Sequence, residues 1–576
     1  MITPRIASVW PRSLVAGALL VCGCQAAKAD FALKPNDRVV FYGDSITEQR
    51  LYTTFAETYV VTRFPKLPVS FVHSGWGGDT AFGSGGGPID LRVQRDVLAY
   101  RPTVMTVMLG MNDGGYRAFD QERYDMYTTG YKHILDSVKQ ADPAVRFTLI
   151  QASPYDDVTR QPGFPGGYNA TLQRFGAFVK DTAAQRGAID ADFNAPVVAM
   201  LQKANATNAD LSQKIIPDRV HPGPAGHLIM AEALLKAWGA PSVVSDVSID
   251  AATNKVARAQ NTQVTDVKSG PTLSWTQLDS ALPFPLDTNN PEMALALKSS
   301  DFVESLDREP LQVTGLTAPN YTLLIDGDEV GDFSREQLAQ GVNLALAATP
   351  MRDQAQNVHR LTIKHNDLHF WRWRSFQVPI TQEHGPAAKA ALPALLKALD
   401  DEEAQMVVEQ RATAQPKPHR FELKVAAPQP IGANLALHKP YTASDPNVYG
   451  YGIGALTDGE WGGDGHTFAT GDKDVFPKTV TIDLQQPASI SQVRVGLPSF
   501  GSTKTVNVSV STDGEKFTEV GSYVYPMAID RRHAFAFAPV NARYVRLTYP
   551  DHYDQEAGFS KMFSFTNEVE VYGAAP

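Results

Sequence analysis

Cysteine is almost absent from this 576-residue chain, in which Cys22 and Cys24 are the only two. Both lie in the first 29 residues, where two arginines precede an apolar run that ends in small residues at Ala29. This layout is typical of a secretory signal peptide. We expect residues 1–29 to be removed and the protein to be exported from a bacterial cell, into the periplasm or the medium. Cleavage after Ala29 removes both thiols and so excludes disulfide bonds.

Two alternatives remain open for this segment. The motif "VCGC" loosely resembles a bacterial lipobox, so that cleavage before Cys24 would leave a thiol for a lipid anchor. A buried N-terminal helix is the second alternative. The apolar run is too short to cross a membrane as a stable helix, and we expect no membrane span.

The chain also lacks any long run of basic residues, and its formal net charge is −10. Nucleic-acid-binding surfaces concentrate positive charge, so we expect no nucleic-acid partner. Hydrophobic residues make up 43% and charged residues 20% of the sequence, which is typical of a globular protein. The length exceeds what one core supports and predicts about two to four domains.

Residues 30–240 alternate between short runs rich in Val, Met and Leu and longer helical patterns. This alternation predicts an α/β domain whose parallel sheet is covered by helices on both faces. Residues 429–576 instead carry short β-branched runs between turn signals, which predict an antiparallel β-sandwich.

The segment between these domains, residues 241–428, is interpreted as a mixed accessory domain. It contains "TLLIDGDEVGDF", which predicts a hairpin around Asp-Gly, and a charged helical pattern over residues 387–410. The alternate spacing of Trp371 and Trp373 predicts a strand that packs both rings on one face, with a glycan platform as the alternative.

Polar motifs follow successive strands of the predicted α/β domain. Ser45 comes after the first strand, Gly78 after the second and Asn112 after the third, and Asp218 and His221 precede the last helix. Ligands of open α/β sheets bind at the carboxyl ends of the strands. A serine nucleophile needs a base and donors for an oxyanion, and these residue types supply both.

Each motif alone has another interpretation. Ser45 could cap a helix, and Asn112 could form a turn. A metal site would draw on His73, Asp79, Asp218 and His221, although these lack a His-x-x-x-His pair. No cofactor is expected for catalysis.

Together and in this order, "GDSITE", "GWGGDT", "GMND" and "DRVH" resemble the four blocks of the SGNH (GDSL-type) hydrolase family over residues 36–240. The resemblance implies a flavodoxin-like three-layer fold and an acyl-enzyme mechanism on esters. It implies these roles: Ser45 as nucleophile, His221 as base, Asp218 as its partner, and Ser45, Gly78 and Asn112 as the oxyanion hole. His73 stands where many relatives have asparagine, a departure that concerns local packing.

Residues 434–573 resemble a discoidin (F5/8 type C) domain, through motifs such as "NLALHKPYTAS", "VSVSTDGEKFTEV" and "EVEVYG". Such domains include carbohydrate-binding modules, and the resemblance implies a structural calcium. Its candidate ligands are Asp458, Thr467 and Glu568, for which ordinary turn and strand chemistry is the alternative. The candidates for stacking on sugar rings are Tyr449, Tyr451, Trp461 and Phe500.

The combination resembles secreted bacterial carbohydrate esterases. We therefore expect a serine esterase that removes O-acetyl groups from an acetylated plant cell-wall polysaccharide of the xylan or xyloglucan type. The alternatives are a lipase, arylesterase or thioesterase acting on longer or aromatic acyl groups, and a non-catalytic glycan-binding protein.

Overall fold

The computed structural model describes residues 31–573, apart from 427–432, 451, 453, 463–465, 528–529 and 557. The predicted signal segment with Cys22 and Cys24 lies outside the described residues, as does Tyr451. Across the described ranges, no helix is both long and apolar enough to cross a membrane.

Five parallel strands form the sheet of the first domain, in the order β2-β1-β3-β4-β5. They are β1 (Arg38–Gly43), β2 (Ser70–Gly75), β3 (Val104–Met108), β4 (Arg146–Gln151) and β5 (Ile189–Asp192). This is the flavodoxin-like strand order. From β1 the chain adds β2 on one side of the sheet, and it then adds β3, β4 and β5 on the other side. Ligands of such sheets bind at the carboxyl ends of β1 and β3, between which the direction changes. The predicted α/β fold is confirmed.

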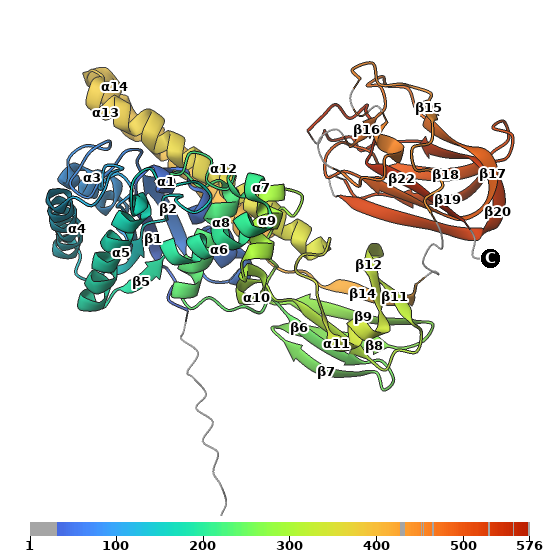
Figure 1. Ribbon diagram of the computed structural model, residues 1–576, viewed down its shortest axis with the longest axis horizontal. Helices are drawn as coiled ribbons and strands as arrows, with labels where there is room; N and C mark the ends of the chain where they lie inside the picture. The colour runs from blue at the N-terminus through green and yellow to red at the C-terminus, as the bar shows by residue number, and fades with distance from the viewer. Residues whose placement is uncertain are drawn as a thin grey trace, which may run out of the picture.

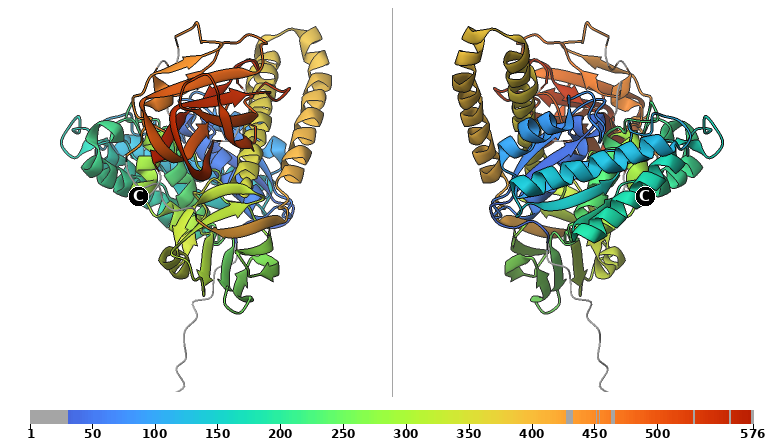
Figure 2. Two further views of the ribbon diagram at one scale, coloured as in Figure 1. Left: turned by 90° about the vertical axis from the view of Figure 1, so that its right-hand side faces the viewer. Right: turned by 90° about the vertical axis from the view of Figure 1, so that its left-hand side faces the viewer.

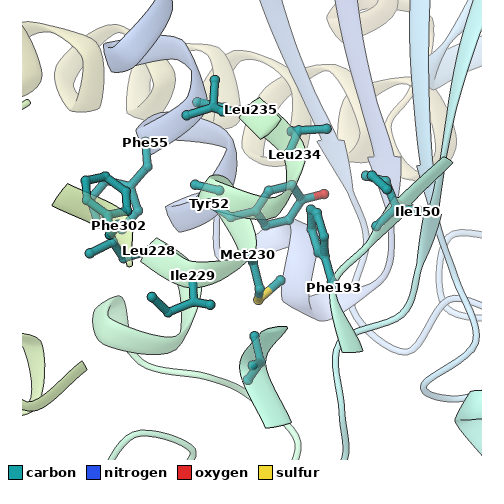
Figure 3. Packing of buried hydrophobic residues seen from close by; sticks show 14 of the residues in the cluster. Tyr52, Phe55, Ile150, Phe193, Leu228, Ile229, Met230, Leu234, Leu235 and Phe302 are labelled. Carbon is teal, nitrogen blue, oxygen red and sulfur yellow. The ribbon is translucent and has the colours of Figure 1, made fainter. Parts of the chain in front are cut away.

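Helices cover both faces of this sheet (Figure 1). Val39 and Phe41 of β1 pack with α2, α6 and α8, whereas Val40 and Tyr42 pack with α3, α4 and α5, since successive strand residues point to opposite faces. Figure 3 shows the first of these two cores, in which α2 and α8 supply most of the labelled side chains. The helices are α1 (Ser45–Glu48), α2 (Leu51–Arg63), α3 (Ile89–Asp96), η1 (Leu98–Tyr100), α4 (Gln121–Ala141), α5 (Gly167–Arg186), α6 (Asn194–Thr207), α7 (Ala209–Ser212) and α8 (Pro224–Ala237).

The second domain contains two sheets, ordered β13-β10-β6-β7 and β12-β11-β14-β9-β8. Their strands are β6 (Asp246–Asp250), β7 (Lys255–Gln260), β8 (Thr262–Lys268), β9 (Thr272–Asp279), β10 (Pro310–Thr314), β11 (Asn320–Ile325), β12 (Asp328–Ser334), β13 (Val342–Asn343) and β14 (His419–Val425). Short helices α9 (Pro291–Ser299), α10 (Phe302–Leu306) and α11 (Arg335–Gln340) connect them. The chain therefore leaves the sheets after β13 and returns to them with β14.

Between β13 and β14 runs a helical segment, residues 350–413. It consists of α12 (Pro350–Phe370), the π-helix η2 (Trp371–Gln377), α13 (Val378–Glu383) and α14 (Pro386–Thr413), and α12 and α14 lie side by side (Figure 2). The predicted strand around Trp371 is wrong. Residues two apart on a helix point in different directions, and accordingly Trp371 is 56% exposed while Trp373 is buried.

A buried charged cluster joins α12 to the first domain. His365 Nε2 lies 2.7 Å from Glu57 Oε1 on α2, and His73 Nε2 on β2 lies 3.3 Å from the other Glu57 oxygen. Glu403 of α14 lies 3.6 Å from His365 Nδ1 and 3.5 Å from His369 Nδ1. Burial opposes a charge on His365, but the two carboxylates outweigh it and raise its pKa to about 10. His365 is therefore a cation at neutral pH.

We expect thermal stability to fall as the pH rises from 6.5 to about 10, because folded His365 holds its proton more tightly than the unfolded histidine. The stabilisation is complete below pH 6.5 and is lost as the pH passes the folded pKa. His365→Gln leaves Glu57 without its cation, so it should cost about 3–5 kcal/mol at pH 6 and flatten this slope. Calorimetry from pH 6 to 10 tests this against His133→Gln, a change at an exposed histidine. Equal slopes in wild type and His365→Gln contradict it.

The third domain is an antiparallel sheet of order β15-β17-β20-β18-β19, with β22 beside β17, and a small β16–β21 sheet. Its elements are β15 (Tyr441–Ala443), η3 (Ala455–Thr457), β16 (Phe468–Ala469), β17 (Lys478–Leu497), β18 (Thr505–Ser511), β19 (Thr518–Val524), β20 (Arg531–Tyr549), β21 (Phe565–Thr566) and β22 (Glu568–Gly573). One continuous core lies under these strands. The predicted antiparallel β domain is confirmed.

Candidate active site

Three polar side chains form a hydrogen-bonded row at the carboxyl edge of the first sheet. Ser45 Oγ lies 2.8 Å from His221 Nε2, and His221 Nδ1 lies 2.6 Å from Asp218 Oδ2. Ser45 and His221 are half-buried, whereas the Asp218 side chain is 53% exposed. In such a row an imidazole can accept the hydroxyl proton while the carboxylate orients the ring.

Ser45 is presented by a tight turn between β1 and α1. Asp44 caps α1, since its Oδ1 accepts a hydrogen bond from the Ile46 N–H at 3.0 Å. The capping role considered for Ser45 therefore belongs to Asp44, and the Ser45 hydroxyl is left to His221. A Cβ at Gly43 would lie 2.7 Å from the Met108 carbonyl oxygen, so the turn needs glycine there.

Asp218 is held by its own loop. Its Oδ1 accepts hydrogen bonds from the N–H groups of Val220 at 2.9 Å and His221 at 2.7 Å. Burial alone raises the pKa of Asp218, but these bonds and the His221 ring outweigh burial and lower it. The carboxylate is therefore ionised at neutral pH.

Asn112 lies against the loop that contains Gly78. Its Nδ2 donates to the Asp79 carbonyl oxygen at 2.9 Å, and its Oδ1 accepts from the Tyr116 hydroxyl at 2.8 Å. An amide nitrogen carries two N–H groups, so one remains for a ligand. Gly78 is exposed at a φ of +72°, a left-handed conformation that favours glycine, and the space beside its Cα is open.

Two buried residues that sequence reasoning missed brace this loop. Asp113 Oδ1 accepts from the Ala81 N–H at 2.7 Å, and burial raises the pKa of Asp113 to about 8. Arg92 Nε donates to Asp79 Oδ2 at 2.8 Å, and its Nη2 donates to the Ser74 carbonyl at 3.0 Å. In the sequence, Asp113 stood out only as the last residue of the motif "GMND". No motif contained Arg92.

The helical segment of the second domain borders the site. The Arg374 guanidinium lies 3.4 Å from the centroid of the Trp76 ring and pairs with Glu48 at 2.8 Å. Trp76 precedes Gly78 by two residues, and Glu48 ends the helix that begins at Ser45. The second domain thus contacts both the nucleophile helix and the loop with the candidate oxyanion glycine.

The residues of the metal alternative are engaged separately. His73 Nδ1 lies 2.7 Å from Thr53 Oγ1 inside the core, while Asp79 is bound to Arg92. In the part of the chain that the structure describes, no group of three or more His, Cys, Asp or Glu side chains is placed to hold a metal ion. His73 instead takes part in the cluster that docks α12.

Residues 41–229 match the model of the GDSL-like lipase/acylhydrolase family. This match defines the first domain as a carboxylic ester hydrolase. Residues 440–565 match the F5/8 type C domain. Both resemblances inferred from motifs are confirmed.

Two relatives indicate how far the similarity extends. An acetylxylan esterase from Geobacillus stearothermophilus is 24% identical over 222 residues, covering 35% of this chain and 94% of the relative. The structure of a gut microbial diltiazem-metabolizing enzyme matches with a TM-score of 0.60 at 27% identity, covering 68% of this chain and 98% of that one. The share of this chain that is covered is larger than the share made up by the first and third domains together. The similarity therefore includes part of the second domain.

The aromatic candidates of the third domain do not form one set. Tyr449 is 67% exposed, whereas Phe500 packs edge-on or tilted against Phe559 and Phe565 at centroid distances of 5.0–5.3 Å. Trp461 lies against β22, where its Nε1 donates to Glu570 Oε1 at 3.1 Å. Tyr451 lies outside the described residues.

The predicted calcium ligands of the third domain include a buried carboxylate and a buried hydroxyl. Glu568 is buried, and among the described residues neither of its carboxylate oxygens has a hydrogen-bond partner of standard geometry, although the backbone N–H groups of Asp458 and Gly459 lie close enough to favour its ionised form. Burial, with the charges of Asp458 and Glu570, raises the pKa of Glu568 to about 9. Thr467 Oγ1 donates to Asn567, which leaves its oxygen lone pairs free. Calcium takes carboxylate and neutral oxygens together, so Glu568 and Thr467 have the chemistry to hold it. The third candidate, Asp458, is paired with His466, whose Nδ1 lies 2.9 Å from Asp458 Oδ2.

We expect chelation with EDTA to lower the melting temperature of the third domain by about 5–10 °C, because a cation bound only by the folded state stabilises it. Added calcium should restore the wild type. Glu568→Gln should abolish this response, whereas Glu515→Gln, an exposed change in the same domain, should retain it. Calorimetry of the full chain measures both, and a wild-type transition indifferent to EDTA and calcium contradicts the site.

Proposed function

We propose that this protein is an exported serine esterase that removes O-acetyl groups from a plant cell-wall polysaccharide of the xylan or xyloglucan type. The observation that carries the proposal is the Ser45–His221–Asp218 row at the carboxyl edge of the GDSL-like domain. The acetylxylan esterase among its relatives and the F5/8 type C domain support an acetylated glycan as substrate.

In the first half-reaction, Ser45 Oγ attacks the acetyl carbonyl carbon while His221 Nε2 takes the hydroxyl proton. Ionised Asp218 stabilises the imidazolium. The N–H groups of Ser45 and Gly78 and the free N–H of Asn112 donate to the oxyanion. His221 then gives its proton to the sugar oxygen, the bond from that oxygen to the acetyl carbon breaks, and the acetyl group stays on Ser45.

In the second half-reaction, a water molecule attacks the acetyl-Ser45 carbonyl while His221 takes one of its protons. The same donors hold the second oxyanion. Collapse breaks the bond to Ser45 Oγ, which recovers its proton from His221, and acetic acid leaves. The chain's own residues supply every proton transfer.

Acetate release from natively acetylated xylan and xyloglucan, in wild type and Ser45→Ala, tests the proposal. Release that disappears in the variant supports it. If wild type hydrolyses 4-nitrophenyl acetate but neither polysaccharide, the glycan substrate is wrong.

Two further assays separate the alternatives. A lipase, arylesterase or thioesterase should prefer butyrate or octanoate esters, aromatic acyl esters or thioesters to acetate esters. A non-catalytic glycan-binding protein should bind polysaccharide equally before and after Ser45→Ala and should not react with a serine-directed phosphonate.

We expect Asn112→Ala to lower kcat about 10²–10³-fold with a smaller effect on KM, because an oxyanion donor acts mainly in the transition state. Asn112→Asp is the matched variant, since it keeps the shape of the side chain and removes the N–H donor. Steady-state kinetics on 4-nitrophenyl acetate measure both. A kcat that stays within threefold of wild type in both variants would remove Asn112 from the oxyanion hole.

A further inference from the structure

A cavity of about 1080 Å³ lies between all three domains. Its lining comes from Gln49, Arg50 and Pro224 of the first domain, from one face of α12, and from residues of the third domain. Gln49 follows Ser45 by four residues, and its Nε2 donates to the Pro222 carbonyl beside His221 at 3.2 Å. The cavity therefore begins one helical turn beyond Ser45, and Ser45 and His221 do not themselves line it. We call it the interdomain groove.

The size of the groove exceeds that of ordinary small-ligand pockets, which are about 300–1,000 Å³. A single acetyl ester needs only a small part of this space. The groove extends from the first domain to β17 and β22 of the third, so it suits an extended ligand rather than a compact one.

The charges of the groove are balanced, because its lining includes six arginines and seven carboxylates. Some already pair with each other, as Arg50 does with Asp367 at 2.6 Å. Such a lining offers donors and acceptors without a strong potential of either sign. It fits a neutral ligand rich in hydroxyl groups better than a polyanion or a polycation.

Aromatic and apolar side chains are interspersed with these charges. On the third domain Trp461 is held by Arg532, 4.5 Å from its ring centroid, and Tyr572 by Arg494 at 5.6 Å. On α12, Ile363 lines the same groove and is 42% exposed. Fixed rings with an apolar body and a polar edge suit sugar rings, which have both kinds of surface.

Direct contacts hold the two walls of the groove together. Tyr523 on β19 donates to Asp328 Oδ1 on β12 at 2.7 Å, and buried Arg531 on β20 donates to the Ala348 carbonyl at 2.8 Å. These contacts link the third domain to β12 and to the chain just before α12. The groove is therefore bordered by direct contacts between the second and third domains.

From this geometry we propose that the interdomain groove binds the polysaccharide backbone and leads its acetylated sugar to Ser45. The proposal rests on the proposed function and adds where the polymer lies. It assigns Trp461 and Tyr572 to this groove, and it makes α12 part of the polymer site.

The proposal is tested by placing a larger side chain on α12, where it would fill part of the interdomain groove. Ile363→Trp adds bulk at an exposed position, and Val408→Trp makes the same kind of change at a residue of α14 that is 62% exposed and lies outside the groove. We measure kcat/KM for acetylated xylan and for 4-nitrophenyl acetate in each variant. The ratio of polymer to aryl-ester kcat/KM should fall about tenfold in Ile363→Trp, mainly through KM, and match wild type in Val408→Trp.

A second measurement is independent of turnover. Affinity electrophoresis in deacetylated xylan, with Ser45→Ala as background, should show about tenfold weaker binding when Ile363→Trp is added. Unchanged binding and an unchanged ratio overturn the groove while acetate release by wild type still supports the proposed function. Loss of binding in Tyr449→Ala but not in Ile363→Trp also overturns it and assigns the polymer to the loops. If wild type neither binds nor deacetylates polysaccharide, both proposals are wrong.

Discussion

Ser45→Ala should lower kcat for ester hydrolysis by about 10⁶-fold, close to the background rate, because no other hydroxyl among the described residues is hydrogen-bonded to His221. The fold should survive. Within the part of the chain that the structure describes, Ser45 Oγ bonds to His221 alone, while Asp44 caps α1 and Gly43 makes the turn. Acetate release and 4-nitrophenyl acetate hydrolysis measure the loss, and near-ultraviolet circular dichroism checks the fold.

Labelling supplies the control for this prediction. A serine-directed phosphonate should modify wild type at residue 45, identified by mass spectrometry of the peptide, and should leave Ser45→Ala unmodified. Ser70→Ala, an exposed change at the start of β2, should keep both activity and labelling. Activity in Ser45→Ala above one hundredth of wild type would mean that another residue is the nucleophile.

The sequence was sufficient to predict the fold of the first domain and to predict which candidate catalytic residues lie close together. Apolar runs such as Val39–Tyr42 predicted strands buried on both faces, and parallel strands end at one edge of their sheet. Polar residues that follow different strands therefore gather there. Ser45 and His221 are far apart in the chain but within hydrogen-bond distance in the structure. Their catalytic roles stay predictions.

The contributions of the second domain could not be predicted in this way. Arg374 contacts Trp76 and Glu48 because α12 docks on α2, and that docking includes a buried pair between Glu57 and His365. Charged residues in a helical pattern are normally solvated, so neither looked like a core residue. The strand predicted around Trp371 failed because it relied on the spacing of two tryptophans, which a continuous helix also accommodates.

Asp218→Asn should lower kcat about 10³-fold while leaving the fold intact. The carboxylate accepts from His221 Nδ1 at 2.6 Å and so keeps Nε2 unprotonated toward Ser45. An amide in that place can donate to Nδ1 instead, which favours the tautomer with a proton on Nε2 and blocks proton transfer from the serine. Losses for a buried triad carboxylate reach about 10⁴-fold, and the 53% exposure of Asp218 lets water replace part of its role.

The matched control is Asp210→Asn, which removes an exposed carboxylate from nearby α7 and should leave kcat within twofold of wild type. Steady-state kinetics on 4-nitrophenyl acetate compare the two variants, and circular dichroism confirms that both are folded. A folded Asp218→Asn with less than a tenfold loss in kcat would show that the hydrogen bond from His221 to Asp218 does not set the tautomer. The backbone N–H groups of Val220 and His221 would then be the main partners of that carboxylate, and its role would be to hold the loop.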